Sequence, residues 1–303
     1  MLTVGTMNFG TRAPRAEAER LVQRALERGV TRFDTANLYN DGEAERVLGA
    51  ALGPRKAQAH LTTKVGLWKK EGLGRARVVA ALDESLGRLG VDSVDLYLLH
   101  APDPATPIEA TLEGIAAVLA SGKAKAWGVS NHASWQILEL SQTCARLGLP
   151  GPKASQVLYN LLIRQLDVEY FRFAAAHPIE TSVFNPLAAG LLARELDEAA
   201  AIPKGSRFES NGLYRRRFWS KPMLRLAAAF RTLAREHGLE PVALAYAFCA
   251  GTPGVDAVVC GPATVAHLDA AVDGCALRLE PTVRAAIDEL HRDHVGTDAR
   301  YAR

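Results

Sequence analysis

The sequence is poor in cysteine and carries little net charge. Its four cysteines, Cys144, Cys249, Cys260 and Cys275, show neither Cys-x-x-Cys spacing nor a histidine at metal-ligand spacing. A disulfide scaffold and a structural metal site are therefore not expected. Lys and Arg number 36 against 33 Asp and Glu, a formal net charge of +3. This balance gives no reason to expect a nucleic-acid or membrane-surface partner.

Long hydrophobic runs are also missing. No stretch approaches the roughly 18 apolar residues that a membrane span requires, and residues 1–6 lack the positive and apolar regions of a targeting leader. We therefore expect a cytoplasmic protein. The chain is 48% hydrophobic and 23% charged, which provides enough apolar material for a large core and excludes a disordered or collagen-like chain.

Short β-branched runs alternate with helical stretches, as expected for βα units around a parallel sheet. Apolar residues recur at helical spacing between these runs, for example over 16–28 and 75–89. Eight βα units in about 300 residues fit an α/β fold of the (β/α)8 TIM-barrel type. We expect residues 1–303 to form one such domain. The predicted strands lie near residues 2–6, 31–34, 60–64, 94–99, 125–130, 154–158, 180–183 and 256–260.

Proline residues predict several helix starts. Thr106, Pro107 and Glu109 have the spacing of a capping box that opens a helix running to residue 119. Pro241 and Pro281 predict two later helix starts in the same way.

Residues 193–221 break the rhythm of strands and helices. They predict an irregular cofactor or substrate loop, because long insertions with ordered aromatic residues usually have a binding role. A Rossmann fold is the weaker alternative: the glycine string that begins at Gly72 comes late and has Arg77 in place of its third glycine.

Four ionisable side chains are predicted at one rim of the barrel. Asp34 and Tyr39 follow the second strand, Lys64 ends the third and His100 follows the fourth. In TIM barrels, reactive side chains extend from these carboxyl ends. Taken singly, each has a simpler explanation as a turn, loop or surface residue. Together they indicate chemistry, because a lysine favours a neighbouring phenolate and an aspartate keeps that lysine charged.

Asp34, Tyr39, Lys64 and His100 together resemble the catalytic tetrad of the aldo-keto reductases, and the resemblance covers nearly the whole chain. It implies reduction of an aldehyde to an alcohol, with hydride from NADPH and a proton from Tyr39; NADH is not excluded. Lys64, held by Asp34, would stabilise the phenolate, and His100 would orient the carbonyl oxygen.

The resemblance also implies a set of cofactor-binding residues on the later strands and loops. Ser130, Asn131 and Gln156 would hold the nicotinamide carboxamide, and Phe184 would stack on its ring. The other expected cofactor contacts are Asn185, Leu187, Gly190, Leu191, Arg207, Asn211, Gly261, Thr264 and His267.

Within this superfamily, the aflatoxin-aldehyde and succinic-semialdehyde reductases are the most similar group. The likeness lies in residues 185–192, 207–219 and the final three residues. It implies that Arg217 and Arg303 hold an anionic substrate group, with the C-terminal tail of about 291–303 reaching the active-site face. Met7, Trp68 and Tyr214 are expected to form an apolar substrate wall. A homodimer is compatible with this likeness.

One segment departs from the family pattern. Ala263 and Ala271 stand where a serine and an adenine-clamping asparagine are expected, so the preference for NADPH over NADH stays open. Thr264, His267 and the amides of a helix N-terminus could still meet a phosphate.

Two other functions fit the same residues. In the first, Lys64 is a Schiff-base nucleophile of a lyase, although Asp34 argues against this by keeping the amine protonated. In the second, the protein is a non-catalytic subunit that senses a nucleotide, which the fold alone does not exclude.

Overall fold

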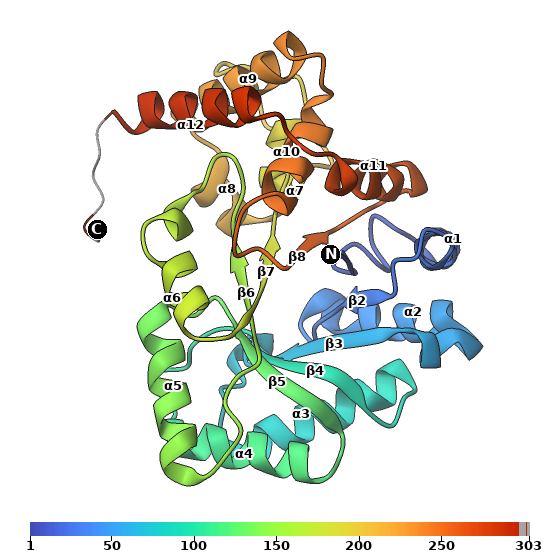
Figure 1. Cartoon of the computed structure of the whole chain (residues 1–303). Coiled ribbons are helices and arrows are strands. Elements are labelled where there is room, and N and C mark those ends of the chain that lie inside the picture. The colour runs from blue at the N-terminus through green and yellow to red at the C-terminus, as the bar shows by residue number, and fades with distance from the viewer. Residues whose placement is uncertain (297–300, 302–303) are drawn as a thin grey trace.

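The computed structural model describes residues 1–296 and 301, and eight parallel strands form a closed barrel (Figure 1). Each strand pairs with the next, and β8 closes on β1 with Val4 opposite Cys260. The predicted TIM barrel is confirmed, and every predicted strand end lies within one residue of the observed one. The strands are β1 (Leu2–Gly5), β2 (Arg32–Asp34), β3 (His60–Val65), β4 (Val94–Leu99), β5 (Ala124–Ser130), β6 (Ala154–Leu158), β7 (Glu180–Phe184) and β8 (Ala257–Cys260).

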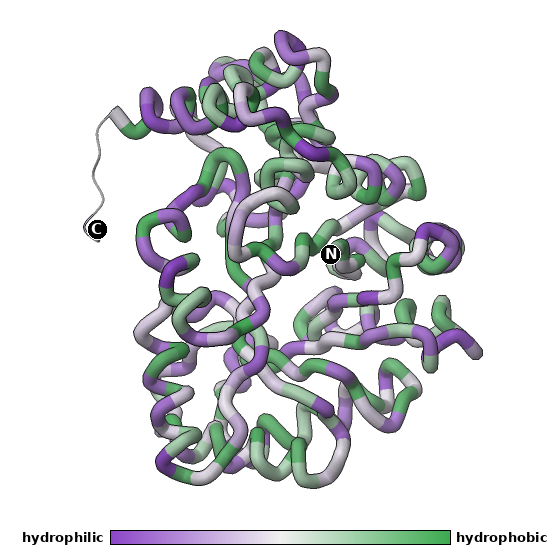
Figure 2. The backbone as a smooth tube through the Cα atoms, in the orientation of Figure 1, coloured by the Kyte–Doolittle hydropathy of each residue, from purple (hydrophilic) through white to green (hydrophobic). Residues whose placement is uncertain are grey.

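Helices surround the barrel, and in Figure 2 hydrophobic and hydrophilic residues alternate along them. The amphipathic pattern predicted α3 with its observed ends and α1 to within one residue. Pro241 and Pro281 begin α10 and α12, as expected from proline's fixed φ. The helices are α1 (Arg15–Glu27), α2 (Glu43–Leu52), α3 (Arg75–Leu89), α4 (Ile108–Ala120), α5 (Ser134–Leu147), α6 (Tyr170–Ala176), α7 (Arg207–Ser210), α8 (Gly212–Phe218), α9 (Lys221–Glu236), α10 (Pro241–Ala250), α11 (Val265–Ala276) and α12 (Pro281–Val295).

Short 3-10 helices occupy several of the connections. They are η1 (Tyr39–Gly42), η2 (Gly53–Gln58), η3 (Trp68–Lys70), η4 (Gln165–Asp167) and η5 (Ala188–Ala193). Two of them, η1 and η3, lie in the loops after β2 and β3, at the carboxyl end of the barrel where the predicted reactive residues gather.

The predicted capping box at Thr106 is wrong. Pro107 itself is the N-cap of α4, and no side chain caps this helix. The Thr106 hydroxyl instead donates to Asp103 Oδ2 at 2.5 Å. The same oxygen accepts the backbone N–H of Leu73 at 2.9 Å. The Thr106 hydroxyl is therefore directed towards a carboxylate of the preceding loop and not towards the amides of the helix.

The segment 193–221 is less irregular than the sequence indicates. It contains α7 and α8 and ends where α9 begins. The side chain of Asn211 caps α8 by accepting the N–H groups of Leu213 and Tyr214 at 3.0 and 3.2 Å. These short helices were missed because each is a turn or two long, too short for a periodic pattern to appear.

The C-terminal region begins as a helix. Residues 291–295 belong to α12, which packs against α9. Residues 297–300, 302 and 303 lie outside the described part of the chain, so the predicted role of Arg303 and of the tail stays a prediction. Over the residues described, no helix has the length and apolar character needed to cross a bilayer.

Candidate active site

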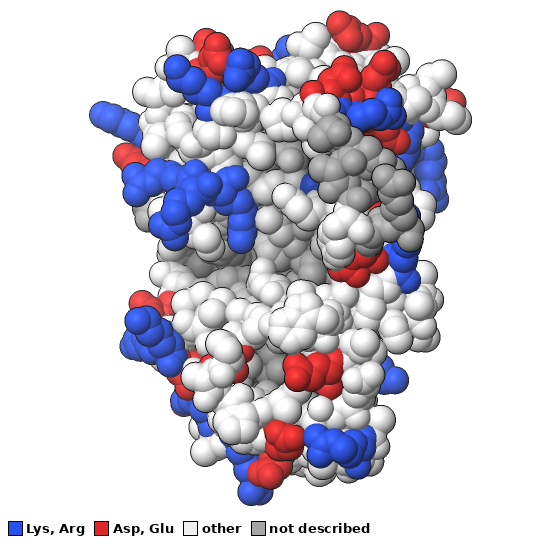
Figure 3. Space-filling model, turned by 90° about the vertical axis from the view of Figure 1, so that its left-hand side faces the viewer, with Lys and Arg blue, Asp and Glu red and all other residues white. Residues whose placement is uncertain are grey.

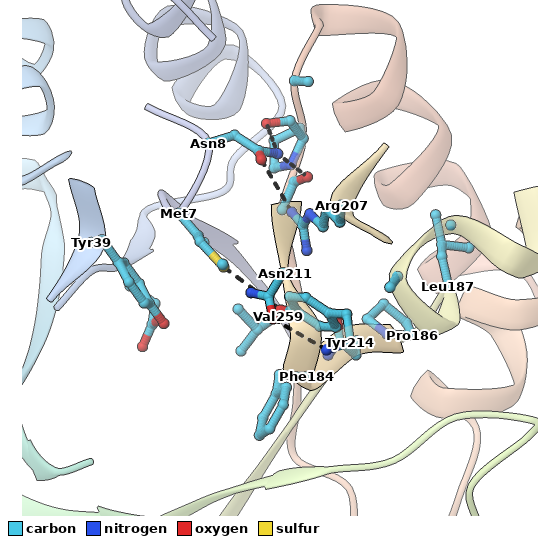
Figure 4. A pocket seen from close by; sticks show the side chains of 18 of the residues that line it. Met7, Asn8, Tyr39, Phe184, Pro186, Leu187, Arg207, Asn211, Tyr214 and Val259 are labelled. Carbon is cyan, nitrogen blue, oxygen red and sulfur yellow. Dashed lines mark hydrogen bonds between the residues drawn. The ribbon is translucent and has the colours of Figure 1, made fainter. Parts of the chain in front are cut away.

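A cavity of about 860 Å³ opens at the carboxyl ends of the strands. Such a volume suits a large ligand, since pockets for small molecules span roughly 300 to 1,000 Å³. Figure 4 shows Tyr39 on one side of the cavity, with Phe184, Tyr214 and Arg207 on the other. The face drawn in Figure 3 is hollowed, and Lys and Arg side chains gather along one edge of the hollow.

Asp34, Tyr39 and Lys64 are in direct contact at the base of this cavity. The Lys64 ammonium donates to Asp34 Oδ1, to the Thr35 carbonyl at 2.8 Å and to the Tyr39 hydroxyl at 3.3 Å. Its side chain is 1% exposed. The second oxygen of Asp34 accepts from Gln156 Nε2 at 2.8 Å. All three protons of the amine therefore have acceptors, and the phenol is left facing the cavity.

Burial and nearby charges shift the pKa values of Tyr39 and Lys64 in opposite directions. Burial raises the pKa of the Tyr39 phenol above its usual value, and the Lys64 ammonium only partly offsets that rise. Burial acts to lower the pKa of Lys64, but the nearby Asp34 and Tyr39 oxygens outweigh it and the net shift is upward. At neutral pH the amine is thus charged and the phenol keeps its proton. The expected effect of Lys64, which acts to lower the pKa of the phenol, is present, but the effect of burial is larger.

His100 lies beside Tyr39, with the two ring centroids 5.9 Å apart and the planes at 81°. Burial and the Lys64 charge lower the pKa of His100 to about 3, so the imidazole is neutral. Its Nδ1 atom is buried and has no hydrogen-bond partner among the described residues. Nε2 is therefore the ring nitrogen that can face a ligand.

The structure brings most of the predicted cofactor residues to the cavity wall. Asn131 Nδ2 donates to the His100 carbonyl at 2.9 Å and to Ser130 Oγ at 3.0 Å, which fixes the orientation of its amide. Arg207 donates to Asn8 Oδ1 at 3.2 Å. The expected cofactor residues that line the cavity are Ser130, Asn131, Gln156, Phe184, Asn185, Leu187, Gly190, Arg207, Asn211, Gly261 and His267.

Of the predicted substrate residues, Met7, Tyr214 and Arg217 line the cavity. The Tyr214 hydroxyl lies 3.7 Å from Met7 Sδ, so two of these side chains touch across the wall. Their roles stay predictions, as do those of the cofactor residues.

Three of the predicted cofactor and substrate residues do not line the cavity, and the same holds for the predicted catalytic residue Lys64. Leu191 is fully buried in the core. The Thr264 hydroxyl caps α11 by accepting the N–H of His267 at 3.3 Å. The Trp68 indole donates to Asp41 at 2.8 Å, and its neighbour Leu67 lines the cavity instead.

Ala263, just before α11, and Ala271 within it have methyl groups where the family pattern has a serine and an asparagine, although His267 of the same helix lines the cavity. Ala263 and Ala270 line the cavity, whereas Ala271 is fully buried. This end of the cavity therefore has fewer polar side chains than the family pattern leads one to expect.

Two arginines that the sequence did not single out, Arg12 and Arg194, also line the cavity. Burial and the charges of Arg207 and Arg194 lower the pKa of Arg12, so these cations crowd one another. Within the described chain no carboxylate pairs with them; Glu195, next to Arg194, pairs with Arg231 and Arg235. A signal was available, because Arg12 follows the end of the first strand and Arg194 follows the 185–192 motif.

Comparison with known proteins identifies the family. The model of the aldo/keto reductase family matches residues 1–292. The chain belongs to the aldo/keto reductase family. The family is one of NAD(P)H-dependent carbonyl reductases, and this chain is one of its enzymes.

Aldehyde reductases and potassium channel subunits are both among the similar proteins. The chain is 36% identical over 227 residues to aflatoxin B1 aldehyde reductase member 2 of Homo sapiens, covering 72% of this chain and 63% of the relative. It is 32% identical over 308 positions to the Mus musculus protein of that name, covering 94% and 83%. It is also 34% identical over 266 residues to a probable voltage-gated potassium channel subunit beta of Arabidopsis thaliana, covering 84% and 80%. The resemblance to the aflatoxin-aldehyde reductase group is confirmed.

Proposed function

We propose that this aldo/keto reductase uses NADPH to reduce aldehydes, including those that carry a carboxylate or a second carbonyl group. The observation that carries the proposal is the contact of Asp34, Lys64 and Tyr39, with the phenol facing the cavity. Tyr39 would protonate the carbonyl oxygen. As the proton leaves, the Lys64 ammonium 3.3 Å away would stabilise the phenolate that forms. His100, being neutral, would donate a hydrogen bond from Nε2 without adding a second charge.

The wall of the cavity fits a nicotinamide dinucleotide phosphate. Four arginines, Arg12, Arg194, Arg207 and Arg217, line it. Unpaired guanidinium groups are suited to phosphates, which they bind with two parallel hydrogen bonds. Asn185 Nδ2 and Ser206 Oγ are buried at the wall without partners among the described residues. The cofactor, when bound, supplies the hydride.

An anionic substrate group would bind at Arg217. The contact is expected from the likeness to the aflatoxin-aldehyde reductases, and it is supported by the place of Arg217 at the cavity wall. Arg303 would assist it. Leu67 and Leu213, which are 42% and 51% exposed, line the same cavity and would contact an apolar part of the substrate. Cytoplasmic location and a homodimeric state stay predictions from the sequence.

The test is the loss of reduced-cofactor absorbance with short aldehydes, with and without a carboxylate, supplied with NADPH or NADH. Tyr39→Phe should lower kcat by roughly a hundredfold or more, because it removes the acid, while the Kd for NADPH stays within about twofold. Tyr97→Phe is the matched control, because Tyr97 is buried and donates to the Val78 carbonyl away from the cavity. Full turnover by Tyr39→Phe would rule out the proton-donor role.

The similarity to a potassium channel β subunit favours one other candidate, a protein that binds the cofactor and docks onto a partner. Cofactor that quenches tryptophan fluorescence but is oxidised by no aldehyde would support this candidate over the reductase. The lyase alternative is weaker, since every proton of the Lys64 amine already has an acceptor. A carbonyl compound trapped on Lys64 by borohydride would instead support the lyase.

A further inference from the structure

The chain directly after Tyr39 adopts an uncommon backbone conformation. Asn40 and Asp41 have φ of 50° and 51°, and Gly42 follows with φ of 81°. Residues other than glycine rarely adopt this left-handed backbone conformation. Two adjacent ones need contacts with their surroundings that hold them in it. Tyr39 is the first residue of η1, so this turn directly follows the backbone that carries the phenol. What holds the turn therefore also holds the phenol.

The side of the turn facing α3 is held by two contacts. The Trp68 indole donates to Asp41 Oδ1 at 2.8 Å. Arg88 packs directly on Gly42: a Cβ atom there would lie 2.7 Å from Arg88 Cδ. Arg88 also lies over the Trp68 ring, 5.9 Å from its centroid. The positive φ of residue 42 thus favours glycine, and a Cβ atom there would force Arg88 to move.

A buried carboxylate keeps Arg88 in place. Glu45 Oε2 accepts from Arg88 Nε at 2.6 Å, with Glu45 fully buried and the Arg88 side chain 10% exposed. The other oxygen of Glu45 accepts from the Thr63 hydroxyl at 2.5 Å. Thr63 precedes Lys64 on β3, and successive strand residues face opposite sides. One carboxylate therefore joins the strand that carries Lys64 to the arginine that holds the turn after Tyr39.

We propose that Glu45, Arg88 and Trp68 are positioning residues that hold the Tyr39 phenol against Lys64. None of the three is among the described residues that line the cavity, so their effect reaches the reaction through the relative position of Tyr39 and Lys64. The inference rests on the proposed proton donation by Tyr39. Its physical reason is that small displacements of a reacting group lower the rate steeply, roughly a hundredfold for about 1 Å.

The experiment compares Glu45→Gln with a matched control, Glu84→Gln. Gln at 45 keeps a side-chain oxygen for Thr63 but removes the charge that holds Arg88. Glu84 is a 39% exposed carboxylate 3.9 Å from the same arginine, and its loss leaves the Glu45 contact intact. Trp68→Phe is the second variant, because it removes the indole N–H that Asp41 accepts and keeps a smaller aromatic ring at the same place.

We expect Glu45→Gln to lower kcat by roughly tenfold to a hundredfold and Trp68→Phe by several-fold. The KM for the aldehyde and the Kd for NADPH should stay within about twofold of wild type, because neither residue lines the cavity. Glu84→Gln should match wild type in all three. Equal kcat in Glu45→Gln and Glu84→Gln, or a parallel loss of cofactor binding, would overturn the proposal. If Glu45→Gln does not fold, unchanged kcat in Trp68→Phe would overturn it instead.

A ground-state measurement separates this proposal from the proposed function. In protein labelled with ¹³C at tyrosine Cζ, the Tyr39 signal is identified by its loss in Tyr39→Phe. That signal should shift in Glu45→Gln and Trp68→Phe and stay in place in Glu84→Gln, since its position reports the distance to the Lys64 charge. If no aldehyde is reduced by wild type, the proposed function fails, yet the signal still tests the positioning. A Tyr39 signal that is the same in all these variants would refute the positioning role.

Discussion

The neutral imidazole of His100 makes a specific contribution to the pH dependence of stability. Burial and the Lys64 charge lower the pKa of His100 to about 3 in the folded protein, against about 6.5 in an unfolded chain. Below pH 6.5 the unfolded state therefore binds a proton that the folded state does not. The free energy of unfolding falls as the pH drops from 6.5 towards 3, and above 6.5 the group has no effect.

The size of this effect follows from the two pKa values. Between about pH 7.5 and pH 5, one such histidine lowers the free energy of unfolding by roughly 2 kcal/mol. At pH 5 the result barely depends on how far below 5 the folded pKa lies. His100 is 8% exposed, so solvent screening does not remove the effect.

The assay is urea unfolding of wild type and His100→Asn at both pH values. The structural cost of the substitution appears at both pH values and cancels in the comparison. His60 and His132, whose pKa values burial also lowers, are common to both proteins. The stability lost on acidification should be smaller in His100→Asn by roughly 2 kcal/mol. An equal loss in the two proteins would show that His100 is charged or accessible in the folded state, and would refute the reasoning.

Three further predictions concern charge and packing. Arg12→Gln should weaken NADPH roughly tenfold and NADH little, measured by fluorescence quenching, if Arg12 meets the extra phosphate; equal losses would argue against that contact. Arg217→Gln should raise the KM of carboxylated aldehydes roughly tenfold and leave that of neutral ones, and equal effects would contradict an anion site. Gly49→Ala should destabilise by about 1 to 3 kcal/mol despite alanine's helix propensity, because its Cβ would lie 2.3 Å from the Leu89 carbonyl oxygen. Gly87→Ala, with nothing within 4 Å of its Cβ, should stabilise by roughly 0.5 to 1 kcal/mol; a matching sign at the two glycines in thermal unfolding would contradict the packing argument.

The barrel could be predicted because its signals are local. Period-2 and period-3.6 patterns report which residues of a short segment face the core, and eight alternations leave few other topologies. The placement of Asp34, Lys64 and His100 at strand ends followed from that count. Segments too short for such patterns were predicted less well: residues 193–221 were expected to be irregular but contain α7 and α8.

The sequence by itself thus determined the eight strands, their alternation with helices and the rim at which polar residues gather, because each depends on neighbours along the chain. Only the tertiary structure decided which hydrogen-bond or charged partner each polar side chain has. Trp68 donates to Asp41 instead of facing the cavity, Thr106 donates to Asp103 instead of capping its helix, and Arg12, in the loop after β1, lies near Arg194, in the loop after β7. Two of these three contacts join residues far apart in sequence, and in each case the partner is set by distance and burial in the folded chain.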